Sequence, residues 1–520
     1  MSRLAPTAGP IAGAGAWSAV LAGEGRARIE AGLPGFLARQ RWFGAKARVV
    51  TGARIRDAVP LGREADAPAL LVADVALADG SVGSYLLVLA VSPSPGAPGG
   101  EVARLDVSGK PAIVDAAEHD PRVARALVGA IGAGGILPGT RGAVVASATP
   151  AFATHAAVLG ALAPSLLGAE QSNTSIRLGE EAVLKLFRRV EPGPNPDVEI
   201  GEFLTTVAGY RHGPAVLGSA VYAPDGGEPA AVAVLQRFVR NRGDAWALAL
   251  GTVAGRRGSA PGVGVSPSTF LDEARLLGRR TAELHLALAS RPDVGPFAPE
   301  PFDRAVQARM RARLVALAGS TLGLLERRAA DLPGGARSLA EELHALRDEV
   351  PRRTAWLVDA DVRADRIRIH GDLHLGQFLR TDDDFVVVDF EGEPARTLAE
   401  RREKGSALRD VAGMVRSFHY ASRADTDLPR EGQVAPAPVE AREAWYAEAS
   451  KAYVEAYLAT AGRARFLPVD RRVVADLLAF HLLEKAVYEV AYELENRPAW
   501  VGLPLGALVE MLRAPPAGSR

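Results

Sequence analysis

The sequence predicts an α+β fold, with strands concentrated in the first half of the chain and helices in the second. Strand-like runs at 69–77 and 84–91, and an apolar run at 182–188, predict the strands. Four later stretches carry apolar residues at helical spacing: 270–289, 329–350, 442–461 and 473–497. Single cores stop growing at about 250–300 residues. A chain of 520 residues therefore predicts more than one domain.

We expect four parts along the chain. They are an N-terminal extension at 1–24, a cap subdomain at 25–150, a small lobe at 151–243 and a helical lobe at 244–520. The basic and aromatic cluster around Trp42 and Lys46 is typical of a packed corner in which cations extend along apolar surface. We therefore expect the cap to be a scaffold without catalytic groups.

The composition excludes several classes of protein. The formal net charge is zero, so no overall field draws the chain to nucleic acid or to an anionic membrane. Cysteine is absent, which rules out disulfides and a thiolate nucleophile and suits a reducing cytoplasm. Residues 1–24 lack the pattern of a signal peptide, and no uncharged stretch is long enough to span a bilayer. We expect a cytoplasmic protein without nucleic-acid or membrane partners.

Two neighbouring segments have the layout of a phosphotransferase centre. Residues 370–377 read His-Gly-Asp-Leu-His-Leu-Gly-Gln, and the apolar strand that follows ends in Asp389. Asp372 matches the catalytic base of a kinase, Gln377 the metal-binding amide and Asp389 the metal-binding carboxylate. Magnesium prefers such oxygen ligands, and Glu391 is a further candidate ligand. We expect ATP and Mg²⁺ as cofactors.

The two histidines of the loop allow two interpretations. His370 and His374 flank Asp372 and are candidate contacts of the phosphate acceptor. Alternatively they are structural or bind zinc, although a zinc site needs more His or Cys at matched spacing.

The small lobe contains a candidate phosphate-binding lysine. Lys185 lies among apolar residues of a predicted strand, as does the kinase lysine that contacts the α and β phosphates. The predicted helix after Pro196 places Glu199 and Glu202 on one face, and we choose Glu199 as the partner of Lys185. The alternative is an edge-strand lysine with its ammonium group in water.

The remaining nucleotide contacts are predicted from position. No glycine-rich phosphate-binding motif is present. The polar run at 172–175 is expected to cover the phosphates instead; its members are Ser172, Asn173, Thr174 and Ser175. The strand at 231–239 runs into a turn where a kinase hinge offers backbone groups to adenine. The expected contacts there are Gln236, Phe238 and Val239.

The acceptor is expected to bind the helical lobe, where tyrosines alternate with carboxylates. Sugars are bound by carboxylates and amides, with aromatic faces under the ring. The candidates are Asp410, Arg416, His419, Tyr420, Tyr488, Glu489, Tyr492 and Glu495. Core packing is the alternative, since an aromatic stripe at helical spacing is usually buried.

The sequence resembles the maltokinase family. The resemblance rests on RWFGAK near the N-terminus, LKLFRR after Val183, NPDVEIGEFL, HGDLHLGQ, DFEGEP, ERREKGSALRDVAG and EKAVYEVAYELENRPAW. It implies a bilobal protein-kinase-like fold with an N-terminal cap. It also implies transfer of the γ-phosphate of ATP to the anomeric hydroxyl of maltose, a reaction that feeds α-glucan synthesis, by a monomer or weak homodimer. Related proteins of this fold phosphorylate glucosamine, aminoglycosides or choline.

Two alternatives stay open. The first is a glucosamine kinase or another amino-sugar phosphotransferase of the same fold, because the family branch includes such enzymes. The second is a catalytically silent, sugar-binding regulator. Lys185, Asp372, Gln377 and Asp389 are all present, so the sequence shows no sign of lost catalysis.

Overall fold

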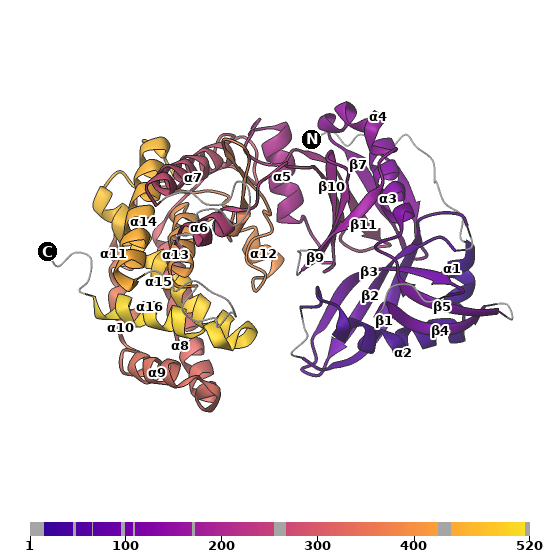
Figure 1. The fold of residues 1–520 in the computed structure, drawn as a ribbon, viewed down its shortest axis with the longest axis horizontal. Coiled ribbons are helices and arrows are strands. Elements are labelled where there is room, and N and C mark those ends of the chain that lie inside the picture. Colours follow the sequence, from indigo (N-terminus) through magenta and orange to yellow (C-terminus); the bar gives the residue numbers. More distant parts are fainter. Residues whose placement is uncertain are drawn as a thin grey trace. The chain divides into compact units, whose positions relative to one another are not determined.

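The computed structural model describes residues 15–44, 48–64, 66–94, 99–107, 110–168, 172–253, 267–424 and 438–514. The chain divides into two compact units, residues 1–240 and 241–520 (Figure 1). The mixed α and β composition and the helical C-terminal unit confirm the predicted fold class. Lys46 lies outside the described residues.

The first unit begins with a five-stranded antiparallel sheet in the order β1-β2-β3-β5-β4. The strands are β1 (Val50–Pro60), β2 (Ala69–Leu77), β3 (Val82–Ser92), β4 (Glu101–Val107) and β5 (Lys110–Ala116). The short helix α1 (Gly15–Val20) precedes α2 (Glu24–Arg39), which lies against β1 and β4 (Figure 1). β2 has the span that the sequence predicts.

The continuous apolar run of β2 has a physical reason, because both of its faces are buried. Successive side chains of a strand point to opposite faces. Leu71 and Ala73 pack into a core with α2, whereas Leu70 and Val72 join a second core. A strand buried on both faces is apolar throughout rather than alternating.

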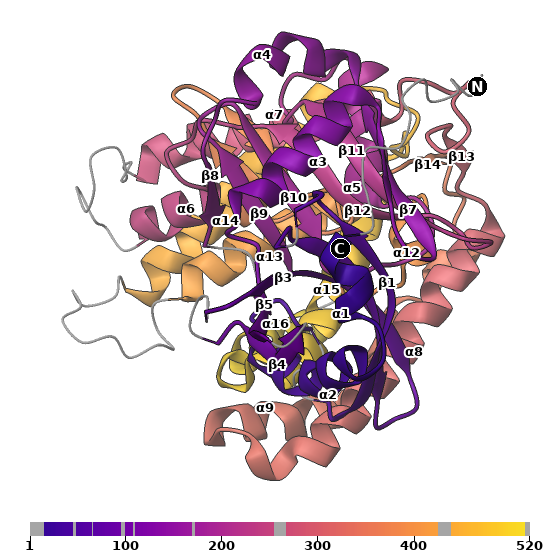
Figure 2. The same ribbon diagram turned by 90° about the vertical axis from the view of Figure 1, so that its right-hand side faces the viewer.

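A seven-stranded sheet completes the first unit, in the order β6-β7-β11-β12-β10-β9-β8. Its strands are β6 (Ile136–Pro138), β7 (Gly142–Ala148), β8 (Pro164–Leu167), β9 (Asn173–Leu178), β10 (Ala182–Phe187), β11 (Val216–Pro224) and β12 (Ala230–Arg237). The helix α3 (Pro121–Ala133) lies across β7 and β11 (Figure 2). Since β6 and β7 belong to this sheet, it begins before the boundary that we expected at residue 150.

The cap sheet is joined to the segment after β10. The Leu86 amide donates to the Arg188 carbonyl (2.8 Å), and the Val190 amide donates to Ser84 (2.9 Å). The Arg188 side chain is buried and donates to the Glu118 carboxylate (2.6 Å) and to the Thr174 hydroxyl (2.7 Å). The cap therefore holds the end of the strand that carries the candidate phosphate lysine.

The second unit is mainly helical. Its helices are α6 (Ala245–Val253), α7 (Pro267–Leu288), α8 (Arg304–Arg328), α9 (Gly334–Ala345), α10 (Glu349–Arg353), α11 (Trp356–Asp359), α12 (Leu398–Arg401), α13 (Leu408–Arg423), α14 (Val439–Ala461), α15 (Arg471–Asn496) and α16 (Gly502–Arg513). α7 packs against α14 and α13 against α15 (Figure 1). Three of the predicted stretches match α7, α14 and α15 closely, and the fourth contains α9. Among the described residues, no helix has both the length and the apolar character needed to cross a bilayer.

Two short strand pairs frame the polar loops of this unit. β13 (Glu300–Pro301) pairs with β14 (Asp365–Arg366), which leads toward the loop 370–377. β15 (Phe378–Arg380) pairs with β16 (Phe385–Val387). The turn between them, residues 381–384, is short and acidic. This hairpin returns the chain to the level of Gln377, since the Val388 amide donates to the Gln377 carbonyl (3.0 Å).

Candidate active site

The loop 370–377 is held by a buried carboxylate. The backbone amides of His370 and Gly371 donate to the two oxygens of Asp410, at 2.8 and 2.9 Å. His285 Nε2 lies 3.0 Å from the same carboxylate. Asp410 is 1% exposed, so it positions the loop from behind. A buried carboxylate needs such partners, which favours a structural role for Asp410, and its contact with the sugar stays a prediction.

The two loop histidines are packed rather than open to an acceptor. His370 is 1% exposed, and its Nε2 contacts the Val388 carbonyl at 3.0 Å. The Gly376 amide donates to His374 Nδ1 (3.1 Å), and burial lowers the pKa of His374, which keeps the ring neutral. This packing favours the structural alternative for His370, and its contact with the acceptor stays a prediction. A sugar contact of His374 stays a prediction.

Asp372 is the carboxylate that the loop leaves partly open. Its side chain is 24% exposed, and its Oδ1 accepts a hydrogen bond from the ammonium group of Lys485 on α15 (3.0 Å). The Asp372 amide donates to His370 Nδ1 (3.4 Å). The loop geometry thus presents one carboxylate oriented by a cation from a distant helix.

Gln377 and Asp389 are brought together by the β15–β16 hairpin. The Gln377 amide nitrogen lies 3.2 Å from Asp389 Oδ2. Asp389 has φ of 67°, and it is the one non-glycine residue with positive φ in the described part of the chain. Such backbone strain persists where the surroundings hold it and is concentrated at functional sites.

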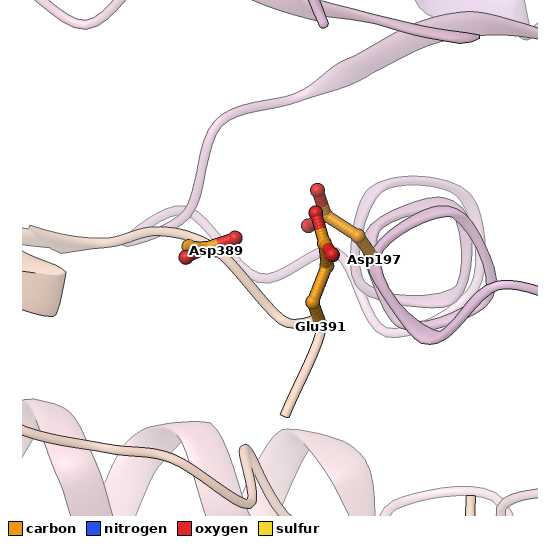
Figure 3. Close-up of side chains that lie close together, drawn as sticks. All are labelled: Asp197, Asp389 and Glu391. Carbon is orange, nitrogen blue, oxygen red and sulfur yellow. The ribbon is translucent and has the colours of Figure 1, made fainter. Parts of the chain in front are cut away.

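This pair suits a magnesium ion. A carboxylate and a side-chain amide offer the hard oxygen ligands that Mg²⁺ takes beside its waters. Glu391 follows Asp389 on the same loop (Figure 3). The roles of Gln377, Asp389 and Glu391 as ligands remain predictions that this chemistry fits.

Glu393 and Lys485 complete the centre of the helical unit. The Glu393 carboxylate is buried and accepts from Lys485 (2.7 Å), Arg396 (2.8 Å) and Arg409 (2.6 Å). Although burial opposes ionisation, Lys485 and the two arginines hold the pKa of Glu393 well below its ordinary value. Burial likewise disfavours the ammonium form of Lys485, but Glu393 and Asp372 raise its pKa.

Sequence reasoning missed this network as a site. Glu393 lies in the same motif as Asp389, and Lys485 lies one turn before Tyr488, so both were visible as polar residues in the quoted motifs. The missing information was their proximity, because 92 residues separate Glu393 from Lys485.

Several of the predicted acceptor contacts instead join α13 to α15. Arg416 is 1% exposed and donates from Nε (2.9 Å) and Nη2 (2.7 Å) to Glu489. Burial lowers the pKa of His419 to about 2, so the ring stays neutral. The Tyr420 hydroxyl donates to Glu493 (3.3 Å). These polar groups are buried in a helix interface, and Tyr420 serves the same interface. Contacts of Arg416, His419, Tyr420 and Glu489 with a sugar stay predictions, and this burial favours the packing alternative.

The tyrosines nearer to Lys485 remain candidates for the acceptor. Tyr488 and Tyr492 are half-buried and stacked, with ring centroids 6.1 Å apart. The Lys485 ammonium group lies 4.8 Å from the centroid of the Tyr488 ring. Glu495 is exposed near the end of α15. Contacts of Tyr488, Tyr492 and Glu495 with a sugar stay predictions.

In the first unit, Lys185 is buried and paired. Its Nζ donates to Asp197 Oδ2 at 3.0 Å, and Asp197 projects from the first turn of α5, Pro196–Thr206 (Figure 3). The predicted alternative, an edge-strand lysine in water, was therefore wrong. Asp197 was not among the predicted partners, and the pairing of Lys185 with Glu199 stays a prediction. The available signal was the acidic residue two positions after the capping Asn195.

The polar run before Lys185 forms a strand rather than a loop. Asn173, Thr174 and Ser175 pair with β10, and Asn173 and Ser175 are buried. The Thr174 hydroxyl accepts two hydrogen bonds from Arg188. Ser172, just before the strand, is exposed. Contacts of the members of this run with phosphate remain predictions.

The expected adenine edge lies at the end of β12. The Phe238 amide donates to the Glu181 carbonyl (2.9 Å), and the Arg177 guanidinium lies 4.4 Å from the centroid of the Phe238 ring. Gln236 Nε2 is buried and has no hydrogen-bond partner among the described residues. The Phe238 amide is thus already used, while Gln236 and Val239 remain predicted nucleotide contacts.

Known proteins resemble this chain in sequence and in fold. Residues 36–132 match the family model of the maltokinase N-terminal cap domain. A glucosamine kinase of Streptacidiphilus jiangxiensis is 30% identical over 347 residues, which are 66% of this chain and 72% of that protein. A glucosamine kinase of Mycolicibacterium smegmatis is 27% identical over 353 residues, 66% of this chain and 78% of that protein.

Solved structures agree with this relationship at the level of the fold. A glucosamine kinase in complex with glucosamine, ADP and inorganic phosphate matches with a TM-score of 0.61 and 24% identity, covering 92% of this chain and 96% of that one. Glucosamine kinase in crystal form B matches with a TM-score of 0.65 and 23% identity, covering 94% and 99%. The chain thus belongs to the maltokinase-like and glucosamine kinase-like family of ATP-dependent phosphotransferases that act on hydroxyl groups.

Proposed function

We propose that this protein transfers the γ-phosphate of ATP to the anomeric hydroxyl of maltose, giving maltose 1-phosphate and ADP. The observation that carries the proposal is the contact of Lys485 with both Asp372 and Glu393. It places an oriented carboxylate beside a cation and the half-buried ring of Tyr488. This combination suits a neutral sugar whose hydroxyl must be aligned for transfer.

In the proposed reaction three sets of groups have separate tasks. Lys185, held by Asp197, contacts the phosphates of the nucleotide. Asp372, oriented by Lys485, aligns the acceptor hydroxyl and takes its proton as the bond to phosphorus forms. Gln377 and Asp389 would hold magnesium, and the ion would supply positive charge to the transferred phosphoryl group. Positioning of this kind supplies most of the acceleration, because phosphoryl transfer needs little covalent work from the protein.

Charge at the site supports a neutral acceptor over an amino sugar. The carboxylates of Glu393 and Asp372 keep Lys485 an ammonium ion despite its burial, and Asp372 already accepts a hydrogen bond from it. An acceptor ammonium group placed beside Lys485 would face like charge, which is unfavourable at short range. A sugar hydroxyl meets no such repulsion.

Glucosamine is the second candidate acceptor. The observation in its favour is that the two curated relatives above are glucosamine kinases, and one of the matching solved structures contains glucosamine. Glutamate and tyrosine side chains on α15 are also chemically able to bind an amino sugar.

An acceptor screen tests the proposal. Release of ADP is measured with maltose, glucosamine, glucose and an aminoglycoside, each with ATP and Mg²⁺, and NMR of the product locates the phosphate. We expect the largest kcat/KM with maltose and a phosphate on its anomeric oxygen. The Asp372→Asn variant is the matched control and should lower kcat by about 10²–10⁴-fold.

A larger kcat/KM with glucosamine would move the assignment to the second candidate. If no sugar stimulates ADP release although maltose binds, the protein is the sugar-binding regulator instead.

A further inference from the structure

The helical unit contains a polar cavity. None of the residues that we propose to take part in phosphoryl transfer lines it. Its volume is about 490 Å³, and its wall includes Arg309, Arg366, Arg368, Arg402 and Lys404. Only two carboxylates, Glu300 and Glu403, share the wall with these five cations. The lining therefore has a surplus of three positive charges.

Both carboxylates are already neutralised by specific partners. Glu300 accepts from Lys404 (2.7 Å) and Arg366 (2.9 Å), and Lys404 lowers its pKa. Glu403 accepts from Arg313 (2.6 Å), a cation outside the wall, and Arg313 lowers its pKa. Both glutamates therefore stay ionised. Their charges are matched by these partners and do not cancel those of the other cations in the wall.

Part of the wall is fixed in advance by contacts within the unit. Arg366 donates to the Lys404 carbonyl (3.3 Å) as well as to Glu300. Arg368 is 1% exposed, and its guanidinium lies 5.4 Å from the centroid of the Phe297 ring. Arg309 on α8 is exposed. A cavity with some cations ordered and one available on the surface loses little side-chain entropy when it takes an anion.

We propose that this basic pocket binds a phosphomonoester, such as a sugar phosphate. Guanidinium groups present several N–H donors in a plane, which matches the oxygens of a phosphate. The volume lies in the range of pockets that hold small molecules rather than single ions.

The wall of the pocket continues into the loops of the transfer centre. Ile367, between Arg366 and Arg368, exchanges backbone hydrogen bonds with Gly405 (3.0 and 2.8 Å). Arg401 on α12 donates to the carbonyl of Glu391 (3.3 Å). A phosphomonoester in the pocket thus contacts two segments. One leads to Asp372, and the other leads to the loop that carries Asp389 and Glu391.

Calorimetric titration tests the proposal. The protein is first saturated with Mg²⁺ and a non-hydrolysable ATP analogue, so that the γ-phosphate position is filled. It is then titrated with glucose 1-phosphate, inorganic phosphate or neutral glucose. We expect saturable binding of glucose 1-phosphate, weakened at least tenfold by Arg309→Glu or Lys404→Gln. Arg304→Glu, an equal charge change at an exposed position of α8 outside the pocket, should change the affinity less than twofold.

The arms separate the sources of the phosphate. Equal affinities for the two phosphates would show that the phosphate group alone is read, and tighter binding of the ester would show a sugar contact. Affinities unchanged by both Arg309→Glu and Lys404→Gln, with matching thermal transitions, would overturn the proposal. Repeating the titration with Asp372→Asn keeps it independent of the proposed function, because this variant lacks transfer but retains the pocket.

Discussion

Lys485 and Asp372 are 113 residues apart in the chain, yet their side chains meet at 3.0 Å. The same ammonium group donates to the buried Glu393 at 2.7 Å. Lys485 on α15 therefore orients the candidate base Asp372. It also neutralises the carboxylate of Glu393, which follows the candidate metal ligands in the chain. This relationship suggests how the helical unit aligns the acceptor side of the reaction.

Replacing Lys485 by Met should lower kcat and stability together. Without the ammonium group Asp372 loses its orientation, and Glu393 loses one of its three cations, which costs about 1–3 kcal/mol for a buried charged group. The measurements are kcat and the free energy of unfolding in urea. Lys451→Met is the control, because Lys451 is exposed and pairs only with Glu455 at 3.9 Å. A Lys485→Met protein with unchanged kcat would refute the positioning role.

Removing the carboxylate of Asp389, the candidate metal ligand, should weaken the magnesium-dependent binding of nucleotide. We expect Asp389→Ala to raise the magnesium concentration needed for half-maximal ATP binding and to lower the rate, since a charged ligand is lost. Fluorescence titration with a labelled nucleotide at several Mg²⁺ concentrations measures this midpoint. If the midpoint stayed at the wild-type value, Glu391 would become the main candidate ligand.

Tyr488 should contribute to sugar binding more than to catalysis. We expect Tyr488→Ala to raise KM for the sugar much more than KM for ATP, the pattern of a contact shared by ground and transition states. Tyr488→Phe retains the ring and should stay near wild type. Equal rises of both constants, or a protein that is merely unstable, would favour the packing role.

The buried Arg188 should couple the cap to the small lobe. The Arg188 guanidinium lies 4.6 Å from the centroid of the Trp42 ring and donates hydrogen bonds to Glu118 and Thr174. Arg188→Ala therefore leaves Glu118 without this cation. Breaking a buried pair typically costs about 3–5 kcal/mol. Thermal unfolding should show this loss, and KM for ATP should rise while the order of preferred sugars stays the same. Arg189→Ala, at a mostly exposed neighbour, is the control. A changed sugar preference would show that the cap acts on the acceptor.

Glu393 should make the free energy of unfolding depend on pH in the acidic range. Its pKa in the folded protein lies below the ordinary value of 4.5, so its contribution is present above pH 4.5 and is lost as pH falls toward the folded pKa. The difference in unfolding free energy between wild type and Glu393→Gln should therefore be largest near neutral pH and shrink below pH 4.5. Urea titrations at several pH values measure it, with Glu455→Gln as an exposed control. A difference that stayed constant with pH would mean that Glu393 has the same pKa in the folded and unfolded states.

The sequence by itself determined the elements and the principal motif. Apolar periodicity and helix caps are local properties, so β2, α14 and α15 appear close to their predicted bounds. The spacing of Gln377 and Asp389 also predicted that they meet, because a short hairpin joins them.

The tertiary structure decided which polar groups face one another. Asp197 as a partner of Lys185, Asp410 behind the loop, and Lys485 on Asp372 all depend on how distant segments pack. The burial of Arg416 and Glu489 was equally hidden, because the same charged residues on a helix can line a site or pair inside an interface. Local pattern determines which face a residue occupies, but only long-range packing determines what that face meets.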